Sequence, residues 1–599
     1  MQKGGHYNVT TKTYSETWDL DVFFQGGSNS EEFHTYLTEI QKELNQFEQQ
    51  IQAFSTDTLD EVLNSYENVV KKVVQASAFI GCLLAQDVKD KTASQLQGKI
   101  AQLHAKLQVQ LGALDEKLVE IDEAEWAKLI QKDAFQPLEY VLNERRRRAG
   151  DKLPAAQEKL VTSLAVDGYH AWGKLYNSIV GTIKIPVEEN GEVKELSVGQ
   201  AQNRFSNGDR EVRKKVSDAW KKAWEGQAET IGAALNHLGG FRLQVYEQRG
   251  WDSVLKEPLE NNRMKQETLD MMWQVITDHK GTLKKYLERK AELLGLEKLN
   301  MYDVSAPLSS EETILSYQEG AEFIIEQFSK FGPELTEFTK QSFEDSWIEA
   351  EDRAGKRPGG FCTSFPVSGQ SRIFMTYSGT LSNVSTLAHE LGHAFHQHAM
   401  HGVPTLNRFY ASNVAETAST FAEMIVADAA VKYAKDEQEK ISLLEDKIQR
   451  SVAFYMNIHA RFLFETRFYD ERKNGLVSVE RLNELMVEAQ KEAYCDSLGE
   501  YDSTFWASKM HFFITQVPFY NFPYTFGYLF SLGIYTQALE EGTNYEEKYI
   551  ALLKDTASMT VEDLAMKHLG VDLTQRDFWE KAVKKSLEDV EEFLQLTNK

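Results

Sequence analysis

Four histidines and one glutamate lie within the fourteen residues from Ser385 to His398, in a chain that has only 14 histidines among 599 residues. Two of these histidines, His389 and His393, are four residues apart in a stretch whose apolar residues recur at helical spacing. Residues four apart on a helix share one face, so two imidazole nitrogens can meet one metal ion. The spacing predicts a metal site on a helix over residues 384–400.

Glu390 completes the pattern His-Glu-x-x-His. It is offset around the predicted helix but stays beside the histidine face, so its carboxylate can reach a water at the metal without being a ligand. A chance match in a chain of this length and histidine content arises on the order of a few per cent of the time. The alternative is a pair of histidines hydrogen-bonded within a helical core. We expect a hydrolytic zinc site, where the metal lowers the pKa of water and Glu390 accepts the proton.

A third metal ligand is expected, because catalytic zinc takes three protein ligands and keeps one position open. The segment from Ser412 to Ile425 also has helical spacing, with Glu416 and Glu423 on one face. Glu416 is predicted to be the third ligand, and Glu423 a carboxylate that orients a histidine. Glu416 could in addition close a capping box that begins at Asn413.

The elements around the histidine helix follow from local signals. We expect the helix to be capped by Ser382 or Asn383. Just upstream, two β-like stretches contain Gly359-Gly360 and a proline, which suits a hairpin at the edge of a sheet. An edge strand can accept an extended peptide, so Gly359 and Gly360 are predicted to lie at the substrate.

Most of the remaining chain has helical spacing, with glutamate, lysine and glutamine on the face opposite the apolar residues, as in residues 31–54, 94–121 and 266–294. The chain is therefore predicted to be predominantly α.

A β-hairpin is predicted at residues 183–198, where branched residues flank Asn190-Gly191, a strong turn signal. Long charged helical stretches follow. We therefore expect an amino-terminal helical lobe, 1–200, and a catalytic domain, 201–599.

The charge balance excludes some classes of protein. The net charge is -25, from 66 basic and 91 acidic residues. Such a chain repels phosphate and anionic lipid, so no nucleic-acid or membrane-surface partner is expected. The run from Arg145 to Arg148 is the local exception, and we interpret it as a solvated face.

Three cysteines are too few to form a disulfide framework in a chain of this size. The amino terminus has no apolar run of signal-peptide length, and the longest apolar segments, 73–86 and 524–535, are shorter than a membrane span. We expect reduced thiols, buried apolar segments and a cytoplasmic protein.

The motifs His389 to His393 and Asn413 to Glu416, with Glu423, resemble the zinc metallopeptidase family of thimet oligopeptidase and neurolysin, whose bacterial branch is oligoendopeptidase F. The resemblance extends to Thr17-Trp-Asp-Leu20 and to the aromatic segment from His511 to Tyr528, so it covers nearly the whole chain. It implies one zinc ion per chain and a zincin-like catalytic lobe with a small β-sheet at the active site. It also implies two helical lobes enclosing a deep channel that admits short peptides.

The aromatic segment could supply donors for the oxyanion, because tyrosine hydroxyls and a histidine N–H suit that role. The resemblance assigns it to His511, Tyr520 and Tyr524, against the alternative that these rings only pack in the core. Tyr528 is left open, since its register relative to Tyr524 differs by one residue from that of the mammalian members. Pro523 predicts an irregular or newly starting helix here.

The expected function is hydrolysis of internal bonds in short unstructured peptides by a zinc-dependent endopeptidase. A dipeptide-releasing exopeptidase of the same family and a noncatalytic peptide-binding protein are the alternatives. A carboxylate-bridged di-iron protein would need a second Glu-x-x-His pair. The sequence offers one at Glu31 to His34, which is interpreted as a surface helix start. The oligomeric state stays open.

Overall fold

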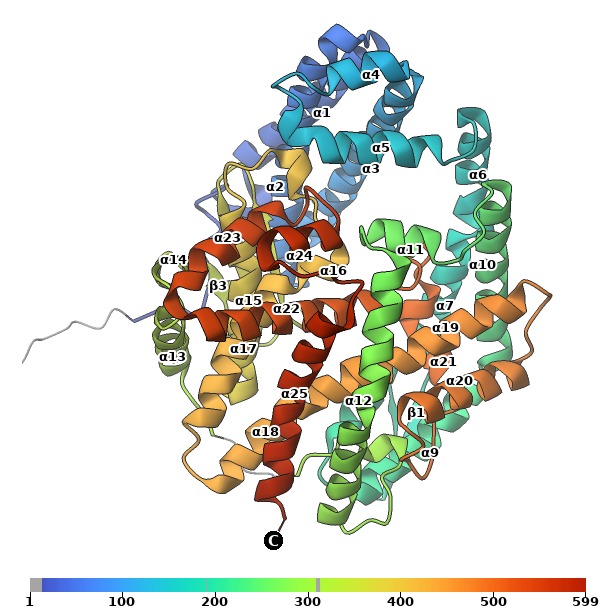
Figure 1. Cartoon of the computed structure of the whole chain (residues 1–599), viewed down its shortest axis with the longest axis vertical. Coiled ribbons are helices and arrows are strands. Elements are labelled where there is room, and N and C mark those ends of the chain that lie inside the picture. Colours follow the sequence, from blue (N-terminus) through green and yellow to red (C-terminus); the bar gives the residue numbers. More distant parts are fainter. Residues whose placement is uncertain (1–12, 190, 309–312, 599) are drawn as a thin grey trace, which may run out of the picture.

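The structure is a computed structural model that describes residues 13–189, 191–308 and 313–598. It is predominantly helical, as predicted, with two small sheets among the described residues (Figure 1). Residues 1–12, on which the expectation of no signal peptide rests, lie outside the described part. The turn residue Asn190 also lies outside it.

The amino-terminal helices, drawn in blue and cyan in Figure 1, pack into a hydrophobic core of their own. Most of its buried residues lie between Trp18 and Leu142. The helices are α1 (Glu31–Gln52), α2 (Leu59–Gln86), α3 (Lys91–Glu120), α4 (Glu123–Leu129) and α5 (Glu139–Gly150).

One helix in the described part of the chain, Thr56–Gln86, is long and apolar enough to cross a membrane by length and composition alone. However, 61% of its apolar window is buried inside the protein. Helices α1 and α3 pack against it. The burial accounts for its apolar residues as core and confirms the prediction of a buried segment at 73–86.

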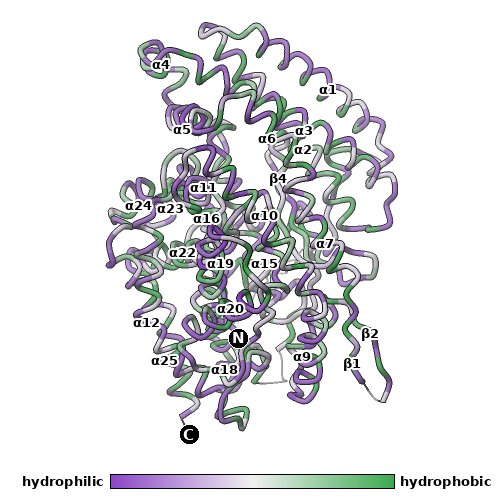
Figure 2. The backbone as a smooth tube through the Cα atoms, turned by 90° about the vertical axis from the view of Figure 1, so that its right-hand side faces the viewer, coloured by the Kyte–Doolittle hydropathy of each residue, from purple (hydrophilic) through white to green (hydrophobic). Residues whose placement is uncertain are grey.

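A second, larger core contains buried residues from Tyr176 to Phe593. Figure 2 shows hydrophilic and hydrophobic residues alternating along many of its helices, as expected for helices that cover a core. The helices that follow α5 along the chain are α6 (Ala155–Gly168), α7 (His170–Thr182), α8 (Val198–Asn203), α9 (Arg210–Glu225), α10 (Ala228–Gln248), α11 (Lys256–Asn261), α12 (Gln266–Leu293), α13 (Tyr317–Ser329), α14 (Pro333–Glu344), α15 (Leu381–Ala399), α16 (Ser412–Ala415), α17 (Thr417–Lys432), α18 (Glu437–Val452), α19 (Ile458–Arg472), α20 (Val479–Ala493), α21 (Phe505–Ser508), α22 (Phe522–Glu541), α23 (Glu546–Asp555), α24 (Val561–Leu569) and α25 (Arg576–Leu596).

The predicted β-hairpin is confirmed. Strand β1 (Ile185–Glu189) pairs with β2 (Glu192–Leu196) in antiparallel register, with Ile185 opposite Leu196. The hairpin contributes buried Ile185, Val187 and Leu196 to the larger core. The predicted domain boundary near residue 200 stays a prediction.

The interpretation of Arg145 to Arg148 as a solvated face holds for Arg147, whose side chain is 52% exposed, but not for Arg145 and Arg146, whose side chains are 21% and 14% exposed. These arginines lie on α5, where Arg145 Nε donates to Asp115 Oδ1 over 2.8 Å and Arg147 Nη1 to Glu260 Oε1 over 2.8 Å. Acidic residues distant in sequence thus pair with the run. It therefore connects α5 to α3 and to the helix α11 of the larger core.

A three-stranded sheet connects the two cores. Its order is β3 (Ile348–Glu349), β5 (Gln370–Phe374), β4 (Phe361–Phe365), and β4 pairs with β5 in antiparallel register. The predicted edge hairpin is therefore confirmed. Successive side chains of a strand point to opposite faces, so Ile373 packs in the larger core and Phe374 in the amino-terminal core.

The histidine helix, α15, starts earlier than predicted. Thr380 caps it, with a side-chain oxygen that accepts the Asn383 N–H over 3.1 Å. The prediction of a cap at Ser382 or Asn383 is wrong, because Thr380 already has the extended backbone of a cap, and the Asn383 side chain accepts the Ser378 N–H instead.

Helix α15 packs closely on α17 at Gly392. A Cβ at this position would lie 2.4 Å from the carbonyl oxygen of Ala418 and 2.6 Å from the Cα of Ser419. The predicted stripe of Val384, Leu387 and related apolar residues is buried. The missing side chain therefore sets the separation of these two helices.

We predict that Gly392→Ala lowers the free energy of unfolding by about 1–3 kcal/mol, because the methyl group has no space between α15 and α17. Gly281→Ala is the matched control, since an added Cβ there meets nothing within 4 Å in α12. Alanine favours helix over glycine, so the control should be neutral or slightly stabilising. Thermal unfolding followed by circular dichroism measures both, and equal effects would contradict the prediction.

Candidate active site

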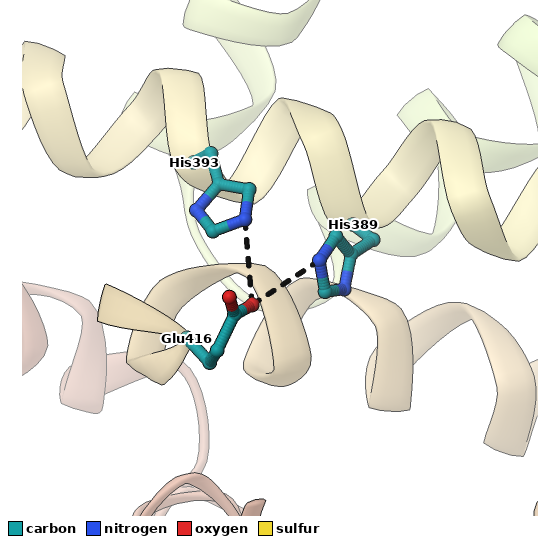
Figure 3. Close-up of side chains that lie close together, drawn as sticks. All are labelled: His389, His393 and Glu416. Carbon is teal, nitrogen blue, oxygen red and sulfur yellow. Dashed lines mark ion pairs between the residues drawn. The ribbon is translucent and has the colours of Figure 1, made fainter. Parts of the chain in front are cut away.

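His389, His393 and Glu416 point toward one another from two neighbouring segments (Figure 3). Glu416 Oε2 lies 3.3 Å from His389 Nε2 and 3.4 Å from His393 Nε2. The three ligand atoms lie within 4.8 Å of one another, and the described residues contain no second group of this kind. The structure thus brings together the three residues predicted as metal ligands.

The donor set fits a metal ion. Ligands at about 2.0–2.1 Å from a tetrahedral zinc ion lie about 3.3–3.4 Å apart, and Glu416 Oε2 lies at these separations from the two imidazoles. Two imidazoles and one carboxylate are also a donor set of catalytic zinc sites. The side chains of His389 and Glu416 are 26% and 23% exposed, so solvent reaches the group.

Glu416 stands at a break between two helices. The predicted single helix from Ser412 is interrupted there, and α17 starts at Thr417. The capping box from Asn413 is wrong, because the buried Asn413 amide donates to the Asn262 carbonyl over 2.9 Å. The Glu416 carboxylate instead accepts the Ser419 hydroxyl over 2.8 Å and faces the histidines.

Glu423 contacts His389 on the side away from Glu416. Its Oε2 lies 3.1 Å from His389 Nδ1, and its Oε1 lies 2.5 Å from Arg450 Nη1. Burial raises the pKa of Glu423, but Arg450 and His389 lower it more, and the net result is a depressed pKa. The carboxylate therefore stays charged and orients the imidazole, with Nε2 toward Glu416. Sequence analysis missed Arg450, because its distance along the chain gives no spacing signal.

The carboxylate of Glu390 lies beside Gly360, the residue immediately before β4. A Cβ on Gly360 would lie 3.3 Å from Glu390 Oε1, so the glycine leaves room there. Gly359 has φ +93°, a conformation that glycine adopts readily. Burial raises the pKa of Glu390, although His389 and His393 oppose this. A raised pKa suits a group that takes up and returns a proton.

Tyr524, Tyr520 and His511 form a continuous row. The Tyr524 hydroxyl donates to that of Tyr520 over 3.0 Å, and the Tyr520 ring stacks on His511 with centroids 5.1 Å apart. Burial, Tyr520 and Glu416 raise the pKa of Tyr524, so its hydroxyl keeps its proton. Arg461 Nη1 lies 2.9 Å from His511 Nδ1. Arginine can only donate, so neutral His511 carries its proton on Nε2.

Tyr528 is not part of this row. Its hydroxyl lies 3.1 Å from Ser451 Oγ, and its ring stacks on Phe454. Helix α22 begins at Phe522 with Pro523 in its first turn, which confirms the predicted new helix start. Tyr528 lies one turn further along this helix, where its side chain is buried against α18 and the residues that follow it.

Comparison with known proteins shows which family this site belongs to. Residues 205–585 match peptidase family M3, and residues 117–185 match the amino-terminal domain described as Oligopeptidase F. The chain belongs to peptidase family M3. The resemblance inferred from the sequence is thereby confirmed, and this M3 protein is a metallopeptidase, which implies a metal cofactor.

Two curated relatives match this M3 peptidase along nearly its full length. The chromosomal oligoendopeptidase F of Lactococcus lactis subsp. cremoris is 26% identical and covers 97% of both chains. Oligopeptidase PepF of Bacillus subtilis is 23% identical over 97% of this chain and 87% of the relative. The structure of oligoendopeptidase-F from Enterococcus faecium has a TM-score of 0.69 at 20% identity, covering 95% of this chain and 99% of that chain, so the fold is shared.

Binding of a divalent metal ion to the M3 site is predicted to release a proton. Burial lowers the pKa of His389, but hydrogen bonds to Glu416 and Glu423 raise it to about 10. A ligating imidazole must be neutral, so below this pKa each bound ion displaces the proton, and affinity rises up to about tenfold per pH unit. Calorimetric titration of metal-free protein with zinc, in buffers of different ionisation enthalpy, counts the protons released. Glu423→Gln should release fewer, and zero release near pH 7.5 would contradict the prediction.

Proposed function

We propose that this M3 metallopeptidase is a zinc-dependent endopeptidase that cuts internal bonds of short, unstructured peptides. The observation that carries the proposal is the pair of separations, 3.3 Å and 3.4 Å, between Glu416 and the two histidines. His389, His393 and Glu416 would hold the zinc ion. When bound, zinc supplies Lewis acidity that polarises the peptide carbonyl and lowers the pKa of water.

Glu390 acts as the general base. Its buried carboxylate takes a proton from the attacking water and then gives it to the leaving nitrogen. Its raised pKa supports the first transfer, since a carboxylate with an ordinary pKa would be a weaker base. The space left by Gly360 gives the carboxylate access to the substrate side of β4.

When substrate binds, the Tyr524 hydroxyl gives up its hydrogen bond to Tyr520, and Tyr524, Tyr520 and His511 donate to the oxyanion of the tetrahedral intermediate. The Tyr524 hydroxyl is protonated, and His511 offers its Nε2–H because Arg461 occupies Nδ1. Arg461 thereby positions His511 for this role.

The peptide backbone pairs with β4, the edge strand of the sheet. Main-chain hydrogen bonds at an edge tolerate many side chains, which suits an enzyme that cuts peptides of varied sequence. The two relatives' names, oligoendopeptidase and oligopeptidase, support short peptides as the substrate class. A channel between helical lobes, as the family resemblance implies, would exclude folded proteins.

We predict that zinc-loaded protein cuts a ladder of unstructured peptides internally, with longer members resistant. Glu390→Gln should keep its zinc and lose about 100- to 10,000-fold in kcat, because general acid–base catalysis contributes about that factor. Mass spectrometry identifies the products, and elemental analysis the metal. Near-normal turnover by the zinc-loaded variant would exclude Glu390 as the base. Dipeptides as the only products would indicate an exopeptidase, and uncut peptides a binding protein.

Tyr524→Phe is predicted to lower kcat about 100- to 1,000-fold with a small change in KM, because an oxyanion donor acts in the transition state. Tyr528→Phe is the matched variant on the same helix, and the hydroxyl it removes bonds Ser451, outside the row. It should cost about 1 kcal/mol of stability and little activity. Steady-state kinetics of both variants test the assignment, and equal losses of kcat would contradict it.

A further inference from the structure

Tyr520, the middle residue of the row of proposed oxyanion donors, lies between two residues that are bonded to one helix. Helix α19 carries Arg461 and Glu465 four residues apart, so their side chains share a face. Glu465 Oε1 accepts the N–H of Phe519 over 3.2 Å, and Arg461 Nη1 donates to Asn521 Oδ1 over 3.0 Å. The residues immediately before and after Tyr520 are therefore both held by α19.

The backbone of Phe519 has an unfavourable conformation. Its φ is +52°, in the left-handed region, where the Cβ of an L-residue lies too close to the next carbonyl oxygen. Bulky side chains are rarely found there. The Phe519 ring is buried and stacks on Tyr469. Strained backbone of this kind persists only where surrounding contacts hold it, and it is concentrated at functional sites. The contacts of Phe519 therefore bear on the function of the row.

Glu465, which accepts the Phe519 N–H, is a buried carboxylate that the mechanism above does not use. Burial raises its pKa to about 7, although Arg242 and the Phe519 N–H oppose this. Arg242 donates to the hydroxyls of Tyr169 and Tyr469, and it acts on Glu465 through its charge. A carboxylate in the interior is costly unless it is hydrogen-bonded. The bond to Phe519 gives this one a structural partner next to the active site.

We propose that Glu465 is a positioning residue: by holding the Phe519 N–H it keeps the left-handed turn in place, and the turn sets where the Tyr520 hydroxyl stands. A hydrogen bond to a charged acceptor is stronger than one to a neutral acceptor, so the carboxylate can offset the strain of the turn. Glu465 acts through Tyr520 rather than on the substrate. The inference rests on the proposed function, because that function gives Tyr520 its part in the oxyanion site.

A shift of Tyr520 would affect the whole row. Its ring stacks on His511 with an angle of 8° between the planes, and its hydroxyl accepts that of Tyr524 over 3.0 Å. If Phe519 left the left-handed region, rotation about its backbone would move the peptide that follows, and with it the Tyr520 ring. Oxyanion donors act at about 2.7–3.1 Å, so a small displacement weakens them. Loss of the bond from Glu465 should therefore lower kcat more than it changes KM.

Two substitutions at Glu465 test the acceptor. Glu465→Leu removes it and should lower kcat about 10- to 100-fold with KM nearly unchanged, since small misplacements near the chemistry cost about this much. Glu465→Gln keeps an oxygen on the same stem and should restore most of kcat. Glu546→Leu is the control, because Glu546 is a buried carboxylate that accepts the Leu335 N–H at the start of α14. It should lower stability and leave kcat unchanged. Wild-type kcat in Glu465→Leu, or equal losses in both Glu465 variants, would overturn the proposal.

Combining Glu465→Leu with Tyr520→Phe tests whether one residue acts through the other. Without the Tyr520 hydroxyl there is less for Glu465 to position, so the double variant should lose clearly less kcat than the product of the two single losses. Losses that multiply would show that the two residues act independently, and Glu465 would then not be a positioning residue for Tyr520.

Hydrogen exchange tests the hold on Phe519 without catalysis. It uses Glu465→Gln, which keeps the shape of the side chain and so the fold. The Phe519 amide should exchange about tenfold faster than in the wild type, because a neutral acceptor holds it less strongly. Mass spectrometry of overlapping peptides across residues 515–523 measures this, and Glu546→Gln should leave the exchange unchanged. Cleavage by the wild type with unchanged exchange in Glu465→Gln would overturn the role of Glu465 alone. Faster exchange in a protein that does not cleave peptides would support the hold on Phe519 and sink the proposed peptidase.

Discussion

The close approach of α15 and α17 at Gly392 determines the geometry of the metal group. One helix carries both histidines, and Glu416 immediately precedes the other, so their separation sets how far the carboxylate oxygen stands from the two imidazoles. A side chain at Gly392 would meet the backbone of α17, which cannot give way as a flexible side chain can. The packing of two helices therefore limits what the site can bind.

Buried charged side chains around the metal group also hold the neighbouring helices in place. His389 lies between Glu416 and Glu423, and Glu423 also pairs with Arg450 on α18. Each charge has a partner of opposite sign, so three helices are held in one arrangement, since a buried charge left unpaired is costly. These paired charges hold the residues that would bind the metal.

The histidine helix and its metal-facing residues could be predicted because spacing along one helix fixes which side chains share a face. The third ligand was also found, but the break in the helix at Glu416 was not, since periodicity continues across it. The caps at Ser382 and Asn413 were wrong because tertiary partners decide among several suitable residues. Arg450 and Arg461 were missed for a related reason: their partners are distant in sequence, and no local pattern marks them.

The sheet beside the site has a mechanical consequence. Neighbouring residues of β5, Ile373 and Phe374, are anchored in different hydrophobic cores. Strand β5 therefore joins the two cores, and a tilt of one core relative to the other would strain it. A substrate peptide paired with β4 would add a strand to the sheet and make the connection between the two cores stiffer. Cleavage would remove the added strand, and the connection between the two cores would become flexible again.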